Sequence, residues 1–199
     1  MKNYIHKMIR CISNMINDLY NRSIIKRKKI EINGFVSING RIGYFGIKNR
    51  LSIGNGTRIN SGDSYIPIGY PGKCVFWIMD SGIITIGRNC GLSNVTICSR
   101  DKVTIGNNVI MGGGVKIYDT DFHSLNYIKR RDLDNDNDRA SKSILIGDDV
   151  FIGAGVIILK GTRIGERSII GAGSVVSGDI PCDEIWAGNP ARCIKKQNN

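Results

Sequence analysis

The chain has 2 histidines, of which His6 lies near the N-terminus and His123 lies in the middle of the sequence. An imidazole with an ordinary pKa of about 6.5 is mostly neutral at pH 7 and can accept a proton from an attacking group. A single histidine is more often structural than catalytic, so its position in the fold decides its interpretation. Asp121 stands two residues earlier and, in extended backbone, projects to the same side. Its carboxylate either fixes the tautomer of the imidazole, or meets a substrate hydroxyl, or is simply a solvated loop residue.

Two other patterns suggest ion sites, and both fail on their spacing. Four aspartates alternate with other residues in the segment that follows: Asp132, Asp134, Asp136 and Asp138. A calcium loop that starts at the first of them requires Gly and Glu where the chain has Asn137 and Ser143. The 6 cysteines form no CxxC pair, and 2 histidines are too few for a zinc site. We therefore expect a solvated loop, no metal, and free thiols.

Aliphatic residues recur at every sixth position through the C-terminal half of the chain: Ile146, Ile152, Ile158, Ile164, Ile170 and Val176. A period of six fits neither the 3.6-residue turn of a helix nor a hairpin, and it indicates a stacked solenoid of short strands and tight turns. If three units make one triangular turn, the aliphatic side chains point into a common core and successive turns stack about 4.8 Å apart. Glycine and other small residues then occupy the corners.

The hexads are interrupted by a charged segment of about 25 residues that begins just before His123. Insertions longer than about 12 to 15 residues are usually functional or disordered. We therefore predict a domain from 30 to 187 with a loop excursion at about 118–143, followed by a C-terminal tail at 188–199.

The N-terminal segment 1–29 differs in kind. Residues 1–50 hold 11 Lys and Arg against Asp18 and Glu31, a charge of +9 out of +11 for the 199 residues. The segment carries an amphipathic helical stripe: Ile5, Met8, Ile9, Ile12, Ile16 and Leu19. We expect this stripe to be buried, either on the first turn of the solenoid near Ile32 and Ile38 or on a neighbouring subunit. Weak contact with an anionic membrane surface is the competing interpretation. The residues expected to pack are Ile5, Ile9, Ile12 and Ile16.

No base-reading or RNA-stacking motif accompanies this charge, so we expect no nucleic-acid partner. Polar residues interrupt the first 18 residues too often for a signal peptide, which favours a cytoplasmic protein with reduced thiols.

The hexads, the histidine at the loop entry, and the later run Gly188-Asn189-Pro190-Ala191-Arg192 resemble the hexapeptide-repeat acyltransferases. The likeness is greatest to the maltose and galactoside O-acetyltransferase group and to surface-polysaccharide O-acetyltransferases. It implies an all-β solenoid, specifically a left-handed parallel β-helix; the handedness comes from the resemblance, since parallel crossovers are otherwise right-handed. It also implies an enzyme that moves an acetyl group from acetyl-CoA to a sugar hydroxyl, and a homotrimer.

The resemblance also carries roles onto individual residues. His123 becomes the general base, and the backbone N–H of Ala154 becomes the donor to the tetrahedral intermediate. The remaining coenzyme positions are Ala172, Ser177, Gly178, Arg192 and Lys195. The family often has lysine where this chain has Gly178, and asparagine where it has Leu92. The acceptor, a sugar or a polysaccharide precursor, stays open, as do N-acetylation of a nucleotide-linked amino sugar and a non-catalytic scaffold.

Overall fold

The computed structural model describes residues 2–68, 70–132, 134, 136 and 138–197, without the side chains of 2–6 and Ile9. Their strands form three sheets, and apart from the β20–β21 pair each strand pairs with the strand three places along the chain. Sheet A contains β1 (Glu31–Ile32), β4 (Leu51–Ile53), β7 (Ile83–Ile86), β10 (Lys102–Ile105), β13 (Ile144–Ile146), β16 (Arg163–Ile164) and β19 (Asp179–Ile180). Sheet B contains β2 (Ser37–Gly40), β5 (Arg58–Ser61), β8 (Gly91–Ser93), β11 (Ile110–Met111), β14 (Phe151–Ile152), β17 (Ile169–Ile170), β20 (Glu184–Gly188) and β21 (Ala191–Lys196). Sheet C contains β3 (Gly43–Gly46), β6 (Val75–Ile78), β9 (Thr96–Ser99), β12 (Lys116–Tyr118), β15 (Ile157–Ile158) and β18 (Val175–Val176).

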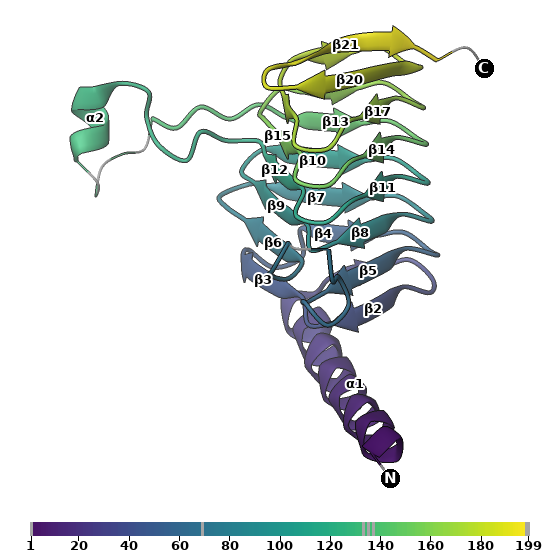
Figure 1. The fold of residues 1–199 in the computed structure, drawn as a ribbon. Coiled ribbons are helices and arrows are strands. Elements are labelled where there is room, and N and C mark those ends of the chain that lie inside the picture. Colours follow the sequence, from purple (N-terminus) through teal and green to yellow (C-terminus); the bar gives the residue numbers. More distant parts are fainter. Residues whose placement is uncertain (1, 69, 133, 135, 137, 198–199) are drawn as a thin grey trace.

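The chain visits the sheets in the repeating order A, B, C, so that its coils stack into a three-sided parallel β-helix (Figure 1). The six aliphatic residues of the C-terminal hexads are all buried, with at most 3% of their surface exposed. Full burial of an aliphatic side chain contributes roughly 1.5–3 kcal/mol, and each coil contributes one such residue from each sheet. The predicted inward row of the hexads is therefore confirmed.

The corners turn the chain from one sheet to the next with two kinds of left-handed residue. At the corner between sheets A and B, Asn89, Asn108 and Asp149 adopt positive φ angles of 56, 56 and 58°. Their side chains form a ladder, in which Asn89 donates to Asn108 at 3.3 Å and Asn108 donates to Asp149 at 3.0 Å. At the corner between sheets B and C the left-handed position is glycine in three coils, at Gly114, Gly155 and Gly173. A Cβ atom on Gly155 would lie 2.4 Å from the Tyr70 hydroxyl oxygen, so glycine makes room for the 62–73 loop.

The long excursion leaves the β-helix between β12 and β13, at the corner between sheets C and A. We call residues 119–143 the arm. It projects away from the sheets and carries the short helix α2 (Tyr127–Arg131) (Figure 1). At the other end of the coil, residues 191–196, which we expected in a C-terminal tail, instead form β21, antiparallel to β20.

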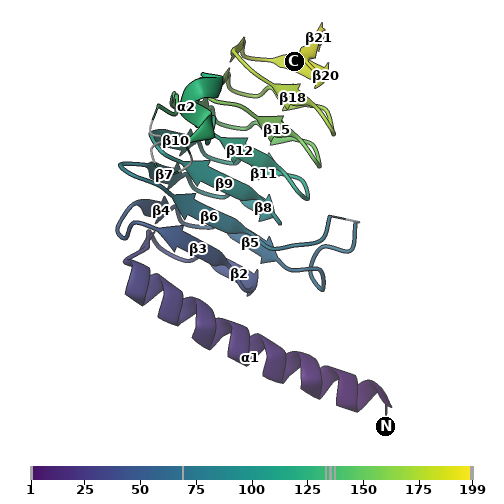
Figure 2. The same ribbon diagram turned by 90° about the vertical axis from the view of Figure 1, so that its left-hand side faces the viewer.

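Helix α1 (Lys2–Lys28) runs beneath the first coil (Figure 2). Its C-terminal part meets the coil through Ile24, which is buried, and through the half-buried Tyr20 and Ile25. Ile12 and Ile16 are 51% and 48% exposed, so the prediction that they pack on the coil of their own chain is wrong. Their packing on a neighbouring subunit stays a prediction. The predicted contacts of Ile5 and Ile9 fall on side chains outside the described set. No helix in the described part of the chain combines the length and apolarity needed to cross a bilayer.

Candidate active site

His123 lies at the entry of the arm and is held by a carboxylate. Its Nδ1 lies 2.8 Å from Oδ2 of Asp136, and the second oxygen of Asp136 accepts the backbone N–H of Ser124 at 2.9 Å. The imidazole is 59% exposed, whereas the side chain of Asp136 is 4% exposed. The arm therefore folds back on itself to place a buried acceptor behind an accessible ring.

The contacts of Asp136 keep its carboxyl group ionised. The hydrogen bond from the Ser124 N–H, followed by the contact with His123, lowers the pKa of Asp136 below its ordinary value. An ionised carboxylate can only accept hydrogen bonds, so the proton of a neutral His123 imidazole resides on Nδ1. The Nε2 atom then carries the lone pair, and this is the arrangement that a general base requires.

Asp121 does not fill the orienting role that its position suggested. Its carboxylate accepts a hydrogen bond from the Lys160 ammonium at 2.7 Å, and both side chains are largely covered. This ion pair ties the start of the arm to the next coil. The prediction that Asp121 fixes the imidazole is wrong, because Asp136 occupies that place. The alternating aspartates predicted Asp136 to be one of four solvated loop residues.

Two further contacts fix the backbone that leads to His123. Asp119, which is fully buried, accepts N–H groups of Arg100 and Asp101 at 2.7 and 3.0 Å and the Ser99 hydroxyl at 2.8 Å. Phe122, with φ at +64°, packs its ring edge-on against Tyr118 at 5.2 Å between centroids. Because the residue before His123 is anchored on the outer face of sheet C, the imidazole has a defined position.

The residues predicted to contact the coenzyme divide between two corners. Ala154 and Ala172 lie between sheets B and C, whereas Ser177 and Gly178 lie between sheets C and A, on the side of the arm. Arg192 and Lys195 are exposed on β21, at the end of sheet B. Within one chain His123 and Ala154 therefore belong to different corners of the triangle, and the structure does not bring them together.

A hollow of about 390 Å³ opens at the corner between sheets B and C, next to Ala154. Its lining includes Tyr70, Lys73, Asn94, Lys116 and Gly155. Asn94 holds this wall in place: its side chain accepts the Gly62 N–H at 2.8 Å and donates to the Tyr70 carbonyl at 2.9 Å.

Asn94 was not predicted as a site residue; it lies two residues after Leu92, which is fully buried in the core. The signal available for Asn94 was its amide in a corner position, where left-handed backbone favours asparagine; its φ is +48°.

Comparison with known proteins agrees with this architecture. A family model described as bacterial transferase hexapeptide (six repeats) matches residues 143–178. The galactoside O-acetyltransferase of Escherichia coli (strain K12) is 39% identical over 117 residues, which cover 58% of this chain and 55% of that protein. The chain spans about half the length of the curated relatives it matches.

Two solved structures share the fold. A hexapeptide-repeat acetyltransferase from Vibrio cholerae, solved with acetyl coenzyme A, has a TM-score of 0.61 at 24% identity and covers 97% of this chain and 89% of that one. AntD, an N-acyltransferase from Bacillus cereus solved with dTDP and 3-hydroxybutyryl-CoA, has a TM-score of 0.69 at 19% identity, covering 90% and 89%. The repeat model and the curated relatives thus show that residues 143–178 match hexapeptide repeats of the bacterial transferase type, and that more than half of the chain is similar to curated O-acetyltransferases.

Proposed function

We propose that the protein is an acetyl-CoA-dependent O-acetyltransferase whose general base is His123. The observation that supports this most directly is the exposed imidazole backed by the buried carboxylate of Asp136. Nε2 of His123 takes the proton of a sugar hydroxyl while the hydroxyl oxygen attacks the thioester carbonyl carbon. The backbone N–H of Ala154 stabilises the oxyanion, and the intermediate collapses as the C–S bond breaks. The imidazolium then returns its proton to the thiolate of the leaving coenzyme A.

The division of the site between corners supports a site shared by two copies of the chain. His123 on the arm of one copy would meet Ala154 of its neighbour, and a closed ring of three left-handed β-helices repeats this contact three times. The same arrangement unites the coenzyme positions: Ala172 of one copy lies along the shared groove with Ser177 and Gly178 of the next. Arg192 and Lys195 would then bind the phosphates at the end of the groove.

For the acceptor we propose a sugar hydroxyl, in a surface polysaccharide or its precursor, acetylated in the cytoplasm. The hollow beside Ala154 has the size of a small-ligand pocket and is lined by amide, hydroxyl and ammonium groups that suit a polyol. An amino sugar on a nucleotide carrier is the second candidate, because the ammonium groups of Lys73 and Lys116 at this hollow suit a diphosphate. A panel of sugars and nucleotide-linked amino sugars, read by release of free coenzyme A, separates the two.

The base and the shared site are tested together by complementation. His123→Ala and Ala154→Trp should each lower the turnover by about 10² or more, since one removes the base and the other blocks the corner. Mixed oligomers refolded from the two inactive variants should regain activity, because some interfaces then pair an intact His123 with an intact Ala154. Near-normal turnover of His123→Ala refutes the mechanism, and mixed oligomers without activity refute the shared site.

The coenzyme contacts have their own test. Arg192→Ala and Lys195→Ala should each weaken coenzyme A binding and flatten its salt dependence in calorimetric titrations, as expected for phosphate contacts. If both variants bind coenzyme A as tightly as the wild type, Arg192 and Lys195 do not contact its phosphates.

A further inference from the structure

Helix α1 carries an exposed apolar row on the face that points away from the β-helix. The described members of the row are spaced by three and four residues, as neighbours on one helical face must be: Met8, Ile12, Met15 and Leu19, with Ile16 beside them. Their exposed fractions run from 48% to 68%. A continuous row of large apolar side chains left in water on a helix is a feature that marks an interaction surface.

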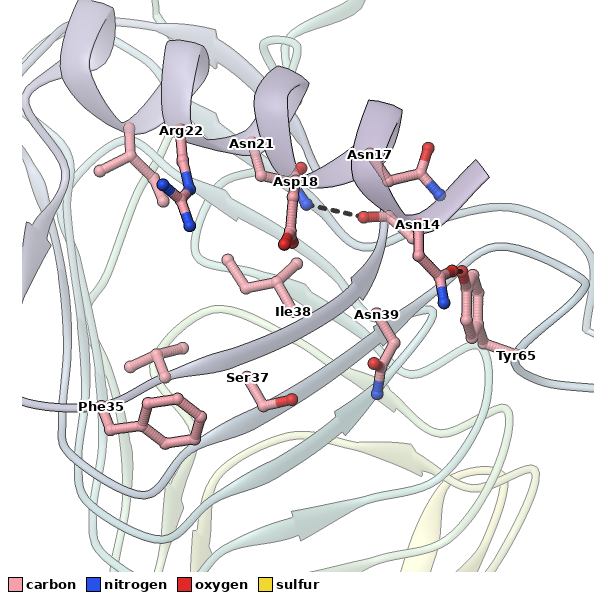
Figure 3. A pocket seen from close by; sticks show the side chains of 13 residues that line it. Asn14, Asn17, Asp18, Asn21, Arg22, Phe35, Ser37, Ile38, Asn39 and Tyr65 are labelled. Atoms are coloured by element: carbon pink, nitrogen blue, oxygen red, sulfur yellow. Dashed lines mark hydrogen bonds between the residues drawn. The ribbon is translucent and has the colours of Figure 1, made fainter. Parts of the chain in front are cut away.

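The opposite face of α1 is polar, and this is the face that meets the coil. Asn14, Asn17 and Asn21 each follow a row member by two residues, a rotation of about 200° around the helix. Asn21 donates to the Gly40 carbonyl at 2.7 Å and accepts the Ile42 N–H at 3.2 Å. The three asparagines face the first coil across a groove (Figure 3). Because these hydrogen bonds fix the rotation of the helix, the apolar row cannot turn inward to bury itself.

The same row changes from apolar to basic toward its C-terminal end. Two helical turns beyond Leu19 the face carries Lys26 and Arg27, both exposed. Two parallel copies of α1 that paired along this row would bring Lys26 against Lys26 and Arg27 against Arg27. Like charges in the seam oppose such pairing. A surface that is apolar in its interior and anionic at its rim complements both parts of the row.

We propose that α1 docks this protein on an anionic lipid bilayer. The apolar row from Met8 to Leu19 enters the boundary between headgroups and acyl chains, while Lys26 and Arg27 contact lipid phosphates. Figures 1 and 2 show the N-terminal half of α1 projecting beyond the strands, so the bilayer can reach the row without meeting the sheets. The sheets and the arm then stand above the membrane surface.

Co-sedimentation of the full-length protein with vesicles tests the proposal. Vesicles of mixed phosphatidylglycerol and phosphatidylcholine should bind the wild type at least about tenfold more tightly than phosphatidylcholine alone, since each basic residue near an anionic surface contributes about fivefold. The combined change Ile12→Gln, Met15→Gln and Leu19→Gln should weaken binding to the mixed vesicles more than tenfold. Lys26→Gln with Arg27→Gln should weaken it by about twentyfold and remove most of its salt dependence.

Leu125→Gln with Ile128→Gln is the matched control, because these side chains on the arm are 76% and 62% exposed but lie away from α1. This variant should bind vesicles as the wild type does, and circular dichroism should show that the row variant stays folded. A wild type without preference for anionic vesicles overturns the proposal. A row variant that keeps its vesicle binding also overturns the proposal. The third contrary result is a wild type that binds no vesicles, together with a row variant whose mass in light scattering is lower than that of the wild type. A second copy of the chain, and not a bilayer, then covers the row.

Discussion

Replacing Asp136 by asparagine should disable the base while leaving the shape of the arm intact. In the wild type, one carboxylate oxygen accepts the Ser124 N–H at 2.9 Å and the other accepts from Nδ1 of His123 at 2.8 Å. An asparagine has one oxygen, which the Ser124 N–H requires, so its NH₂ group would face Nδ1. A donor at that place forces Nδ1 to accept and moves the imidazole proton to Nε2. The lone pair that should receive the substrate proton is then lost.

The expected fall in kcat is about 10² to 10⁴, or about 2.7–5.5 kcal/mol in activation free energy, the range of a general base held in its wrong tautomer. KM for acetyl-CoA should change little, because the hydrogen bonds of Asp136 go to His123 and Ser124 and not to a predicted coenzyme residue. Turnover is measured by free coenzyme A release, and the tautomer by the ¹⁵N shifts of the His123 ring.

Asp138→Asn is the control. It makes the same chemical change two residues further on, where the exposed carboxylate pairs with Lys129 at 2.6 Å, and it should keep the wild-type rate. If Asp136→Asn turns over within twofold of the wild type while His123→Ala does not, the carboxylate does not set the tautomer and the reasoning fails.

Three further outcomes follow from the same coordinates. The folded pKa of Asp136 lies below its ordinary value near 3.9, so its contacts stabilise the arm fully above about pH 4 and are lost as the pH falls through the lowered value. The fluorescence of Trp77, which contacts the start of the arm, should follow this acid transition in a Trp186→Phe background and should not do so when Asp136 is asparagine. Gly40→Ala should reduce the free energy of unfolding in guanidinium by more than the roughly 1 kcal/mol expected for Gly173→Ala; both have positive φ, but a Cβ on Gly40 would also overlap the Ser61 carbonyl. Thiol labelling of the native protein should modify the three exposed cysteines quickly and the three buried ones only after unfolding. Burial raises the pKa of Cys74 and Cys98 to about 12, which removes their reactive thiolate at neutral pH. The exposed set is Cys11, Cys182 and Cys193, and the buried set is Cys74, Cys90 and Cys98.

The sequence was enough to predict the coil because the rule behind it is local. An aliphatic side chain at every sixth position can be buried only if the chain turns at the same interval, and Ile146 and Ile152 have no exposed surface at all. The arm and the placement of His123 at its entry follow from the point where this rule stops. Asp136 could not be identified in this way, because it is 13 residues from His123 in the sequence and no repeat relates the two positions. Nothing in the alternation of four aspartates distinguishes the one that the arm folds inward.

The rotation of α1 shows why an amphipathic pattern can predict the wrong side. Periodicity identified an apolar stripe, and burial of apolar surface favours turning that stripe toward the coil. The first coil, however, presents unpaired backbone groups at its open end, such as the Gly40 carbonyl and the Ile42 N–H. Leaving a buried polar group without a hydrogen-bond partner costs about 1–3 kcal/mol. Leaving an isoleucine exposed loses a similar free energy of burial, but binding of that side chain to another surface can recover it. The amide of Asn21 satisfies both groups with one side chain. A helix that covers the end of a β-helix is thus selected by hydrogen bonding as well as by hydrophobicity, and its apolar face remains available for a partner.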